Sequence, residues 1–136
     1  MYITFYCGNF LFALPVADVM EIKRSFPITH VPKGPSYVEG IINLRGQIIT
    51  AIHLAKRIGL VSYDDKKDYY HIIIKTSEEP VSILVEEIGE VISINEKDME
   101  PVPEHLEGMD IKYIKNISKL YDNKLIIILD SDAIQQ

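Results

Sequence analysis

The chain has 136 residues and a formal net charge of −6, and this size favours one domain. The negative charge repels phosphate backbones, which argues against broad nucleic-acid affinity. Cys7 is the only cysteine, so an internal disulfide and any site of several thiolates are excluded. No apolar run approaches the about 20 residues that span a bilayer, and the N-terminus lacks the pattern of a secretory signal. We therefore expect a soluble, cytoplasmic protein.

Short runs of β-branched and aromatic residues, separated by turn residues, predict many strands. Gly8-Asn9 marks the turn of a first hairpin, and Pro15 ends its ladder because proline lacks an N–H. Arg45-Gly46 lies at the turn of a second hairpin, where glycine adopts positive φ at little steric cost. In chain order the predicted strands are residues 3–7, 10–14, 28–31, the hairpin 41–52, 69–76, 81–85, 89–94, and a last hairpin of 113–121 and 124–129.

Helical signals are few. Residues 54–60 have helical spacing with Gly59 as a stop, and Asp130 begins a segment suited to capping a short C-terminal helix. Residues 16–22 predict one helical turn passing into a strand. Many strands with one or two short helices argue for an all-β barrel or sandwich.

A seven-residue pattern occurs twice. Residues 16–22 read V-x-acid-h-x-E-h, where h is apolar, and residues 85–91 read the same. Each segment comes after a predicted strand and is followed later by a predicted hairpin. Two related β lobes would explain this echo.

The sequence gives little support to catalysis or metal binding. The four histidines, at positions 30, 53, 71 and 105, include no pair at helical i, i+4 spacing, and neither HExxH nor CxxC occurs. Cys7 lies in a predicted strand, and a buried inert thiol is the favoured interpretation. No GxSxG, P-loop or GxGxxG motif occurs. We therefore predict no catalytic residue, no metal and no cofactor.

Two charged residues stand out because their neighbours are apolar. Glu21 lies among Val19, Met20 and Ile22, and Arg45 lies in an apolar hairpin. If the two were buried together, they would form a structural ion pair. The alternative for Arg45 is an interface contact, because its planar fork binds carboxylates at two points.

Four blocks of the chain, in order, resemble the CheW-like domain family of chemotaxis coupling proteins. They are F-A-L-P-V-A-D-V-M-E-I from residue 12, the block of residues 32–49 that contains G-I-I-N-L-R-G, residues 83–91, and I-I-I-L-D from residue 126. The resemblance implies two five-stranded SH3-like β-barrel lobes, packed together as two intertwined subdomains of one domain over residues 1–136. The chain departs from the family pattern at His53 and Glu86, where aspartate is common, and at Asn116, where glycine is frequent.

The resemblance also implies a role. Such adaptors couple transmembrane chemoreceptors to the histidine kinase CheA, whose regulatory domain shares the fold, and they bind the cytoplasmic tip of the receptor. This places the chain in the cytoplasm at membrane receptor arrays, with no insertion into the bilayer.

The resemblance gives the candidate site residues. We expect an apolar groove between the lobes to accept a receptor helical hairpin, lined by Val19, Val85 and Ile88, with Arg45 near the rim; for each apolar residue, plain core packing is the alternative. Apolar hairpin edges are expected to be exposed and to meet the kinase. Their candidate residues are Ile42, Leu44, Ile48, Ile117 and Ile127. Gly40 and Gly46 are the expected turn glycines.

A second hypothesis comes from another class. A β-barrel with many tyrosines would suit an oligonucleotide-binding module that stacks bases on aromatic rings. The candidates are Tyr69, Tyr70, Tyr113 and Tyr121. The acidic balance of the chain argues against it.

Overall fold

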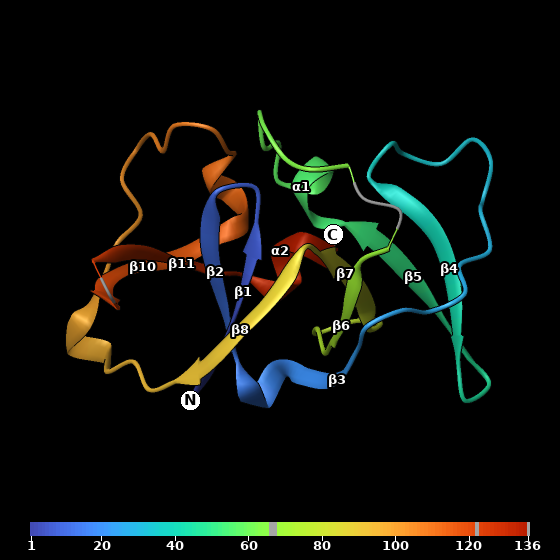
Figure 1. Ribbon diagram of the computed structural model, residues 1–136, viewed down its shortest axis with the longest axis horizontal. Helices are drawn as coiled ribbons and strands as arrows, with labels where there is room; N and C mark the ends of the chain where they lie inside the picture. The colour runs from blue at the N-terminus through green and yellow to red at the C-terminus, as the bar shows by residue number, and fades with distance from the viewer. Residues whose placement is uncertain (66–67, 122, 136) are drawn as a thin grey trace.

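The computed structural model describes residues 1–65, 68–121 and 123–135. These residues form two β-sheets and two short helices, as the sequence predicts (Figure 1). The strands are β1 (Tyr2–Cys7), β2 (Phe10–Pro15), β3 (Val19–Lys23), β4 (Val38–Leu44), β5 (Gln47–His53), β6 (Tyr70–Ile74), β7 (Val81–Val85), β8 (Glu87–Ile92), β9 (Met99–Glu100), β10 (Ile114–Tyr121) and β11 (Lys124–Leu129). The helices are α1 (Leu54–Arg57) and α2 (Ser131–Gln135), and the 3₁₀ turns are η1 (Val16–Asp18), η2 (Glu96–Asp98) and η3 (Ile111–Tyr113).

Each sheet forms one SH3-like lobe. The sheet of lobe A has the strand order β8-β1-β2-β11-β10-β9, and the sheet of lobe B has the order β3-β6-β7-β5-β4. Lobe B has the five strands that the family resemblance implies. Lobe A has a sixth because the two-residue strand β9 pairs with β10.

The two halves of the chain exchange strands. The first half gives β1 and β2 to lobe A but β3, β4 and β5 to lobe B, whereas the second half gives β6 and β7 to lobe B and β8 to β11 to lobe A. Two parallel pairs, β2–β11 and β5–β7, join the halves. This exchange is what a pair of intertwined subdomains requires, while the single domain over residues 1–136 stays a prediction.

Equivalent hydrogen bonds relate the two halves. The His53 N–H donates to the Tyr37 carbonyl at 2.7 Å, and the Asp130 N–H donates to the Tyr113 carbonyl at 2.9 Å. His53 and Asp130 each stand directly before a short helix, so they occupy equivalent positions. Counting two residues back, Ala51 is equivalent to Ile128.

The parallel pairs carry this equivalence to the repeated sequence pattern. Ala51 pairs with Ser82 and its equivalent Ile128 pairs with Ala13, so Ser82 is equivalent to Ala13. Three residues further on, position 85 is equivalent to position 16. The strand registers therefore align residues 16–22 with residues 85–91, which is the alignment of the sequence echo.

The main hydrophobic core lies between the lobes. It buries Phe5 and Phe12 from lobe A together with Ile72 and Ile83 from lobe B. Burying a side chain of this size contributes about 1.5–3 kcal/mol. The shared core therefore stabilises the packing of one lobe on the other as well as each lobe itself.

The predicted turn and caps are confirmed. Arg45 and Gly46 have φ of 49° and 89°, and two positive φ values are what a two-residue I′ hairpin turn needs. Helix α1 is shorter than the predicted 54–60, and Gly59, at φ 73°, follows its end. The Asp130 Oδ1 accepts hydrogen bonds from the N–H groups of Asp132 and Ala133 at 3.1 and 3.2 Å and so caps α2.

Two predictions about β4 and the segment before it are wrong. Residues 28–31 form no strand but an isolated bridge from Thr29 to Ile41, and Gly40 lies inside β4 and not in a turn. Gly40 has φ 153°, and a Cβ there would clash with the Thr29 carbonyl oxygen. Glycine is required because the segment before β4 crosses the backbone of this strand too closely for a side chain.

We predict that Gly40→Ala lowers the free energy of unfolding by about 3 kcal/mol, because Thr29 must move and the backbone is strained. Gly46→Ala is the control, since its Cβ would meet nothing within 4 Å, and positive φ alone costs about 1 kcal/mol. Urea denaturation followed by circular dichroism measures both. Equal losses in the two variants would contradict the close approach at Gly40.

Candidate functional site

Strands β3 and β8 are the equivalent edge strands of the two lobes. Val19 on β3 and Ile88 on β8 occupy equivalent positions, and both side chains are partly buried against the shared core. The structure therefore brings these two predicted groove residues to one core cluster from opposite lobes. Val85 is fully buried in that core, so its prediction as a surface contact is wrong, and core packing describes it.

Both edge strands carry a bulge, and the bulge exposes a second apolar pair. Val19 and Ile22 pair with Ile74 and Ile72, and the register shifts between them. The four residues from Val19 to Ile22 thus match three on β6, which puts Val19 and Ile22 on the same face.

Strand β8 repeats this geometry. Ile88 and Val91 pair with Phe5 and Ile3 across an equivalent shift. Ile22 and Val91 are both exposed. Sequence reasoning missed these two residues because strict alternation places positions three apart on opposite faces. The repeated pattern, which ends on both of them, was the available signal.

We call Val19, Ile22, Ile88 and Val91 the edge-strand surface. Its four members come from equivalent positions of the two halves, two from each lobe. Partly covered apolar side chains on unpaired strand edges are typical of a protein-binding surface.

Glu21 and Arg45 form an ion pair, with 2.9 Å between Oε1 and Nη2. The Arg45 side chain is 73% exposed and the Glu21 side chain 20% exposed, so the pair is not the buried pair that the sequence suggested. Glu21 lies on β3 and Arg45 in the turn after β4, at opposite edges of the sheet of lobe B. The pair therefore links the two edge strands of this lobe.

The predicted kinase-contact residues divide by burial. Four of the five are buried, so the expectation that they form exposed edges is wrong: Ile42, Leu44, Ile117 and Ile127. They point into the cores because successive strand residues alternate between faces. Ile48 alone among the five is exposed, at 55%. It lines a surface pocket of about 270 Å³ with Tyr37, Val38 and Pro80.

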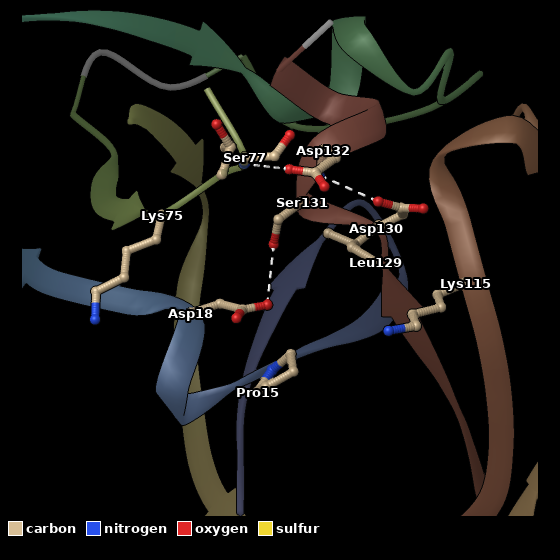
Figure 2. Close-up of a pocket in the computed structure, with 10 residues that line it drawn as sticks. Pro15, Asp18, Lys75, Ser77, Lys115, Leu129, Asp130, Ser131 and Asp132 are labelled. Carbon is tan, nitrogen blue, oxygen red and sulfur yellow. Dashed lines mark hydrogen bonds between the residues drawn. The ribbon is translucent and has the colours of Figure 1, made fainter. Parts of the chain in front are cut away.

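A polar pocket of about 250 Å³ lies between the lobes (Figure 2). The Ser131 hydroxyl donates to Asp18 Oδ2 at 3.3 Å, and the Ser77 N–H donates to Asp132 Oδ1 at 2.6 Å. These bonds fasten α2 to η1 and to the connection between β6 and β7. Among the described residues, no group of three His, Cys, Asp or Glu is placed to hold a metal. The pocket acts as a polar seam between the lobes.

His53 caps α1 although aspartate is common at this position in the family it resembles. Its Nδ1 accepts from the Lys56 N–H at 3.2 Å, and its Nε2 lies 3.0 Å from the Tyr69 hydroxyl. Burial, followed by the charge of Lys56, lowers the pKa of His53. A neutral imidazole keeps Nδ1 free of a proton, which the cap requires.

His71 and Cys7 are buried and chemically quiet. The His71 Nδ1 lies 3.1 Å from the Ser82 hydroxyl, and burial lowers the pKa of His71 to about 4. Burial raises the pKa of the Cys7 thiol to about 12, and the charge of Glu86 adds to this effect. Both groups are therefore neutral near pH 7, as structural residues would be.

The three candidate tyrosines whose side chains the structure describes do not form a stacking platform. Tyr113 is buried. Tyr69 lies edge-on to the His53 ring at 5.1 Å, and Tyr70 lies under the Arg24 guanidinium at 5.6 Å. The side chain of Tyr121 lies outside the described residues. Rings already occupied in this way do not support base stacking.

We predict that the free energy of unfolding falls as the pH drops from about 6.5 to about 4. Unfolded His71 titrates near 6.5 but folded His71 near 4, so the unfolded chain binds more protons in this window, at about 1.4 kcal/mol per pH unit. His53 acts in the same direction. Urea denaturation at pH 7, 6 and 5 measures the slope. His71→Asn should flatten it, and an unchanged slope in this variant would contradict the assignment.

These features define a two-lobed SH3-like β protein whose edge strands β3 and β8 each carry an exposed apolar residue. The chain matches the CheW-like domain family over residues 1–136. It is 31% identical to the chemotaxis protein CheW of Helicobacter pylori, over 98% of this chain and 79% of that protein. It is 36% identical to the chemotaxis protein CheW of Thermotoga maritima, over 90% of this chain and 78% of that one.

A solved structure agrees. The chain matches the crystal structure of the scaffolding protein TtCheW from Thermoanaerobacter tengcongensis with a TM-score of 0.89 and 34% identity, covering 98% of this chain and 90% of that one. The chain therefore belongs to the CheW-like domain family, and it is an adaptor or scaffold of chemotaxis. Among the described residues, no helix is long and apolar enough to cross a membrane.

Proposed function

We propose that this chain is a non-enzymatic adaptor that couples transmembrane chemoreceptors to the histidine kinase CheA. It works in the cytoplasm, at the cytoplasmic tips of receptors in arrays. The observation that carries the proposal is the match to the CheW-like family over residues 1–136. The placement of apolar side chains on the surface supports it.

The edge-strand surface is the proposed receptor site. Val19 and Ile88 contribute partly buried apolar area from the two lobes, and Ile22 and Val91 extend it into solvent. Such a strip suits the apolar face of a receptor helical hairpin, in the manner of helix-in-groove recognition. Arg45 lies beside β3 through its bond to Glu21, at the rim of this strip.

The hairpin of β4 and β5 is the proposed kinase site. Ile48 is its exposed apolar contact. Ile42 and Leu44 shape the hairpin from within lobe B. In lobe A, Ile117 and Ile127 support the last hairpin from the shared core. The partner surface would be the regulatory domain of CheA, whose fold resembles that of this chain.

The adaptor acts through differential contacts and changes no covalent bond. When the receptor favours one arrangement of the bound kinase, the adaptor carries this preference as a coupling free energy, about 1–3 kcal/mol in typical cases. Both partners must then be held on one body, so the two surfaces need a fixed separation.

We predict that the two surfaces can be disabled separately. Ile22→Glu and Val91→Glu should each weaken receptor binding at least tenfold, because the contact would bury an unpaired charge, and leave kinase binding within about twofold. Ile48→Glu should do the reverse. All three side chains are exposed, so folding is expected to survive. Calorimetric titration against a receptor cytoplasmic fragment and the CheA regulatory domain measures both affinities.

The variants serve as controls for each other. If Ile22→Glu and Ile48→Glu weakened both partners alike, the division into two surfaces would be wrong. If the unmodified chain bound neither partner, the proposed function would be overturned.

A second pair of variants assigns the role of Arg45. We predict that Arg45→Ala weakens receptor binding about tenfold while lowering stability by less than about 1 kcal/mol, because the arginine is exposed. Glu21→Gln removes the carboxylate but leaves the guanidinium, and should weaken receptor binding far less. Titration with the receptor fragment and urea denaturation measure the two effects. Equal losses of affinity would assign Arg45 to the ion pair and not to receptor contact.

A further inference from the structure

Arg57, the last residue of α1, binds the end of α2. Its Nε donates to the Ile134 carbonyl at 2.9 Å, and its Nη2 lies 3.4 Å from the Ala133 carbonyl. Helix α1 follows β5 of lobe B, whereas α2 follows β11 of lobe A. One side chain therefore joins the two lobes through charge-assisted hydrogen bonds to carbonyls that end a helix.

The same guanidinium contacts two tyrosine rings. Its central carbon lies 4.3 Å from the centroid of the Tyr37 ring and 4.9 Å from that of Tyr113. Tyr37 directly precedes β4 in lobe B, and Tyr113 directly precedes β10 in lobe A. A guanidinium over an aromatic face is attracted by the negative charge of the ring face. The arginine thus meets equivalent aromatic residues from both lobes.

The duplication shows that this contact belongs to one half only. His53 and Asp130 are equivalent, so four residues further on Arg57 is equivalent to Ile134. Ile134 is fully buried in the shared core, whereas Arg57 is half-buried. The arginine therefore donates to the backbone of its own counterpart, and a single residue serves both lobes.

The space around Arg57 makes the contact separable from the core. A surface pocket of about 380 Å³ is lined by Arg57, Lys112, Tyr113 and Ala133. The guanidinium therefore lies at the surface end of the lobe junction, beside Tyr113 and Ala133 of the shared core cluster. Its removal should loosen this junction without opening a cavity in the core.

We propose that Arg57 is a positioning residue for the receptor site. By holding α1 on α2 it fixes the orientation of lobe B relative to lobe A, and so fixes β3 relative to β8. The edge-strand surface draws two residues from each of these strands, so its shape depends on this orientation. The kinase site on the β4–β5 hairpin lies in lobe B alone, so its shape does not depend on this orientation. This inference rests on the proposed function for the receptor site but not for the junction itself.

The test uses the whole chain with Arg57→Met, which keeps length and apolar contact but removes the charge and the donors. Lys56→Met is the matched control, because the Lys56 ammonium pairs with Glu39 at 3.5 Å, within lobe B. Spin labels at Asn9→Cys in lobe A and Gln47→Cys in lobe B, in a Cys7→Ala background, report the distance between lobes by electron–electron double resonance. Titrations with the receptor fragment and the CheA regulatory domain give the affinities.

We expect Arg57→Met to broaden the distance distribution and to weaken receptor binding about tenfold, with kinase binding changed less than about twofold. Arg57→Lys should fall between, because an ammonium keeps the ring contact but lacks the planar fork. Lys56→Met should match the unmodified chain in every readout.

Three results would overturn the inference. An unchanged distance distribution in folded Arg57→Met would show that Arg57 does not fix the orientation of the lobes. If the methionine variant fails to fold, the same result in Arg57→Lys would show this. A broadened distribution with unchanged receptor affinity would remove the positioning role. Equal losses for receptor and kinase would mark a general loss of stability. If the unmodified chain bound no receptor, the proposed function would fail. The distance measurements would still test whether Arg57 fixes the orientation of the two lobes.

Discussion

The structure depends on the exchange of strands between the two halves of the chain. Phe12 pairs with Ile127 and Ile52 pairs with Ile83 in parallel register, so each sheet is completed by strands from the other half. A parallel pair needs a long crossover. The connection from β2 to β11 runs through all of lobe B, whereas the connection from β5 to β7 runs through α1 and β6. The shared core follows from this connectivity, because neither lobe can bury its apolar face before the other half arrives. Pairings so distant in sequence also predict slow folding.

The exchange also explains where the proposed receptor site lies. Strand β3 enters lobe B after one 3₁₀ turn from lobe A, and only Glu86 separates β7 in lobe B from β8 in lobe A. Both crossing strands become sheet edges at the junction of the lobes, and the equivalent residues Val19 and Ile88 meet the same core. A surface built across the junction follows directly from the crossing, without any added element.

Most local features could be predicted from the sequence, whereas most long-range ones could not. The Arg45-Gly46 turn and the Asp130 cap follow from short-range backbone chemistry, and both are present. Burial at Val85 and Ile42 depends on which face of a strand packs against which lobe, and the pattern of a single sequence does not predict this. Gly40 is required because the backbone of a distant segment approaches it, a contact that composition and spacing do not reveal. Ile22 and Val91 could not be predicted because the bulges in β3 and β8 break the two-residue period of a strand.

The equivalent positions at which the halves differ show how two lobes of the same fold come to present different surfaces. His53 and Asp130 cap equivalent helices with different groups, and Arg57 stands where the other half has the buried Ile134. A symmetric pair of lobes would offer two similar surfaces and would not distinguish one partner from another. The differences at the helix ends give each lobe its own surface. Coupling between different partners requires that difference, because a free-energy preference passes only between sites that make unequal contacts with the states they join.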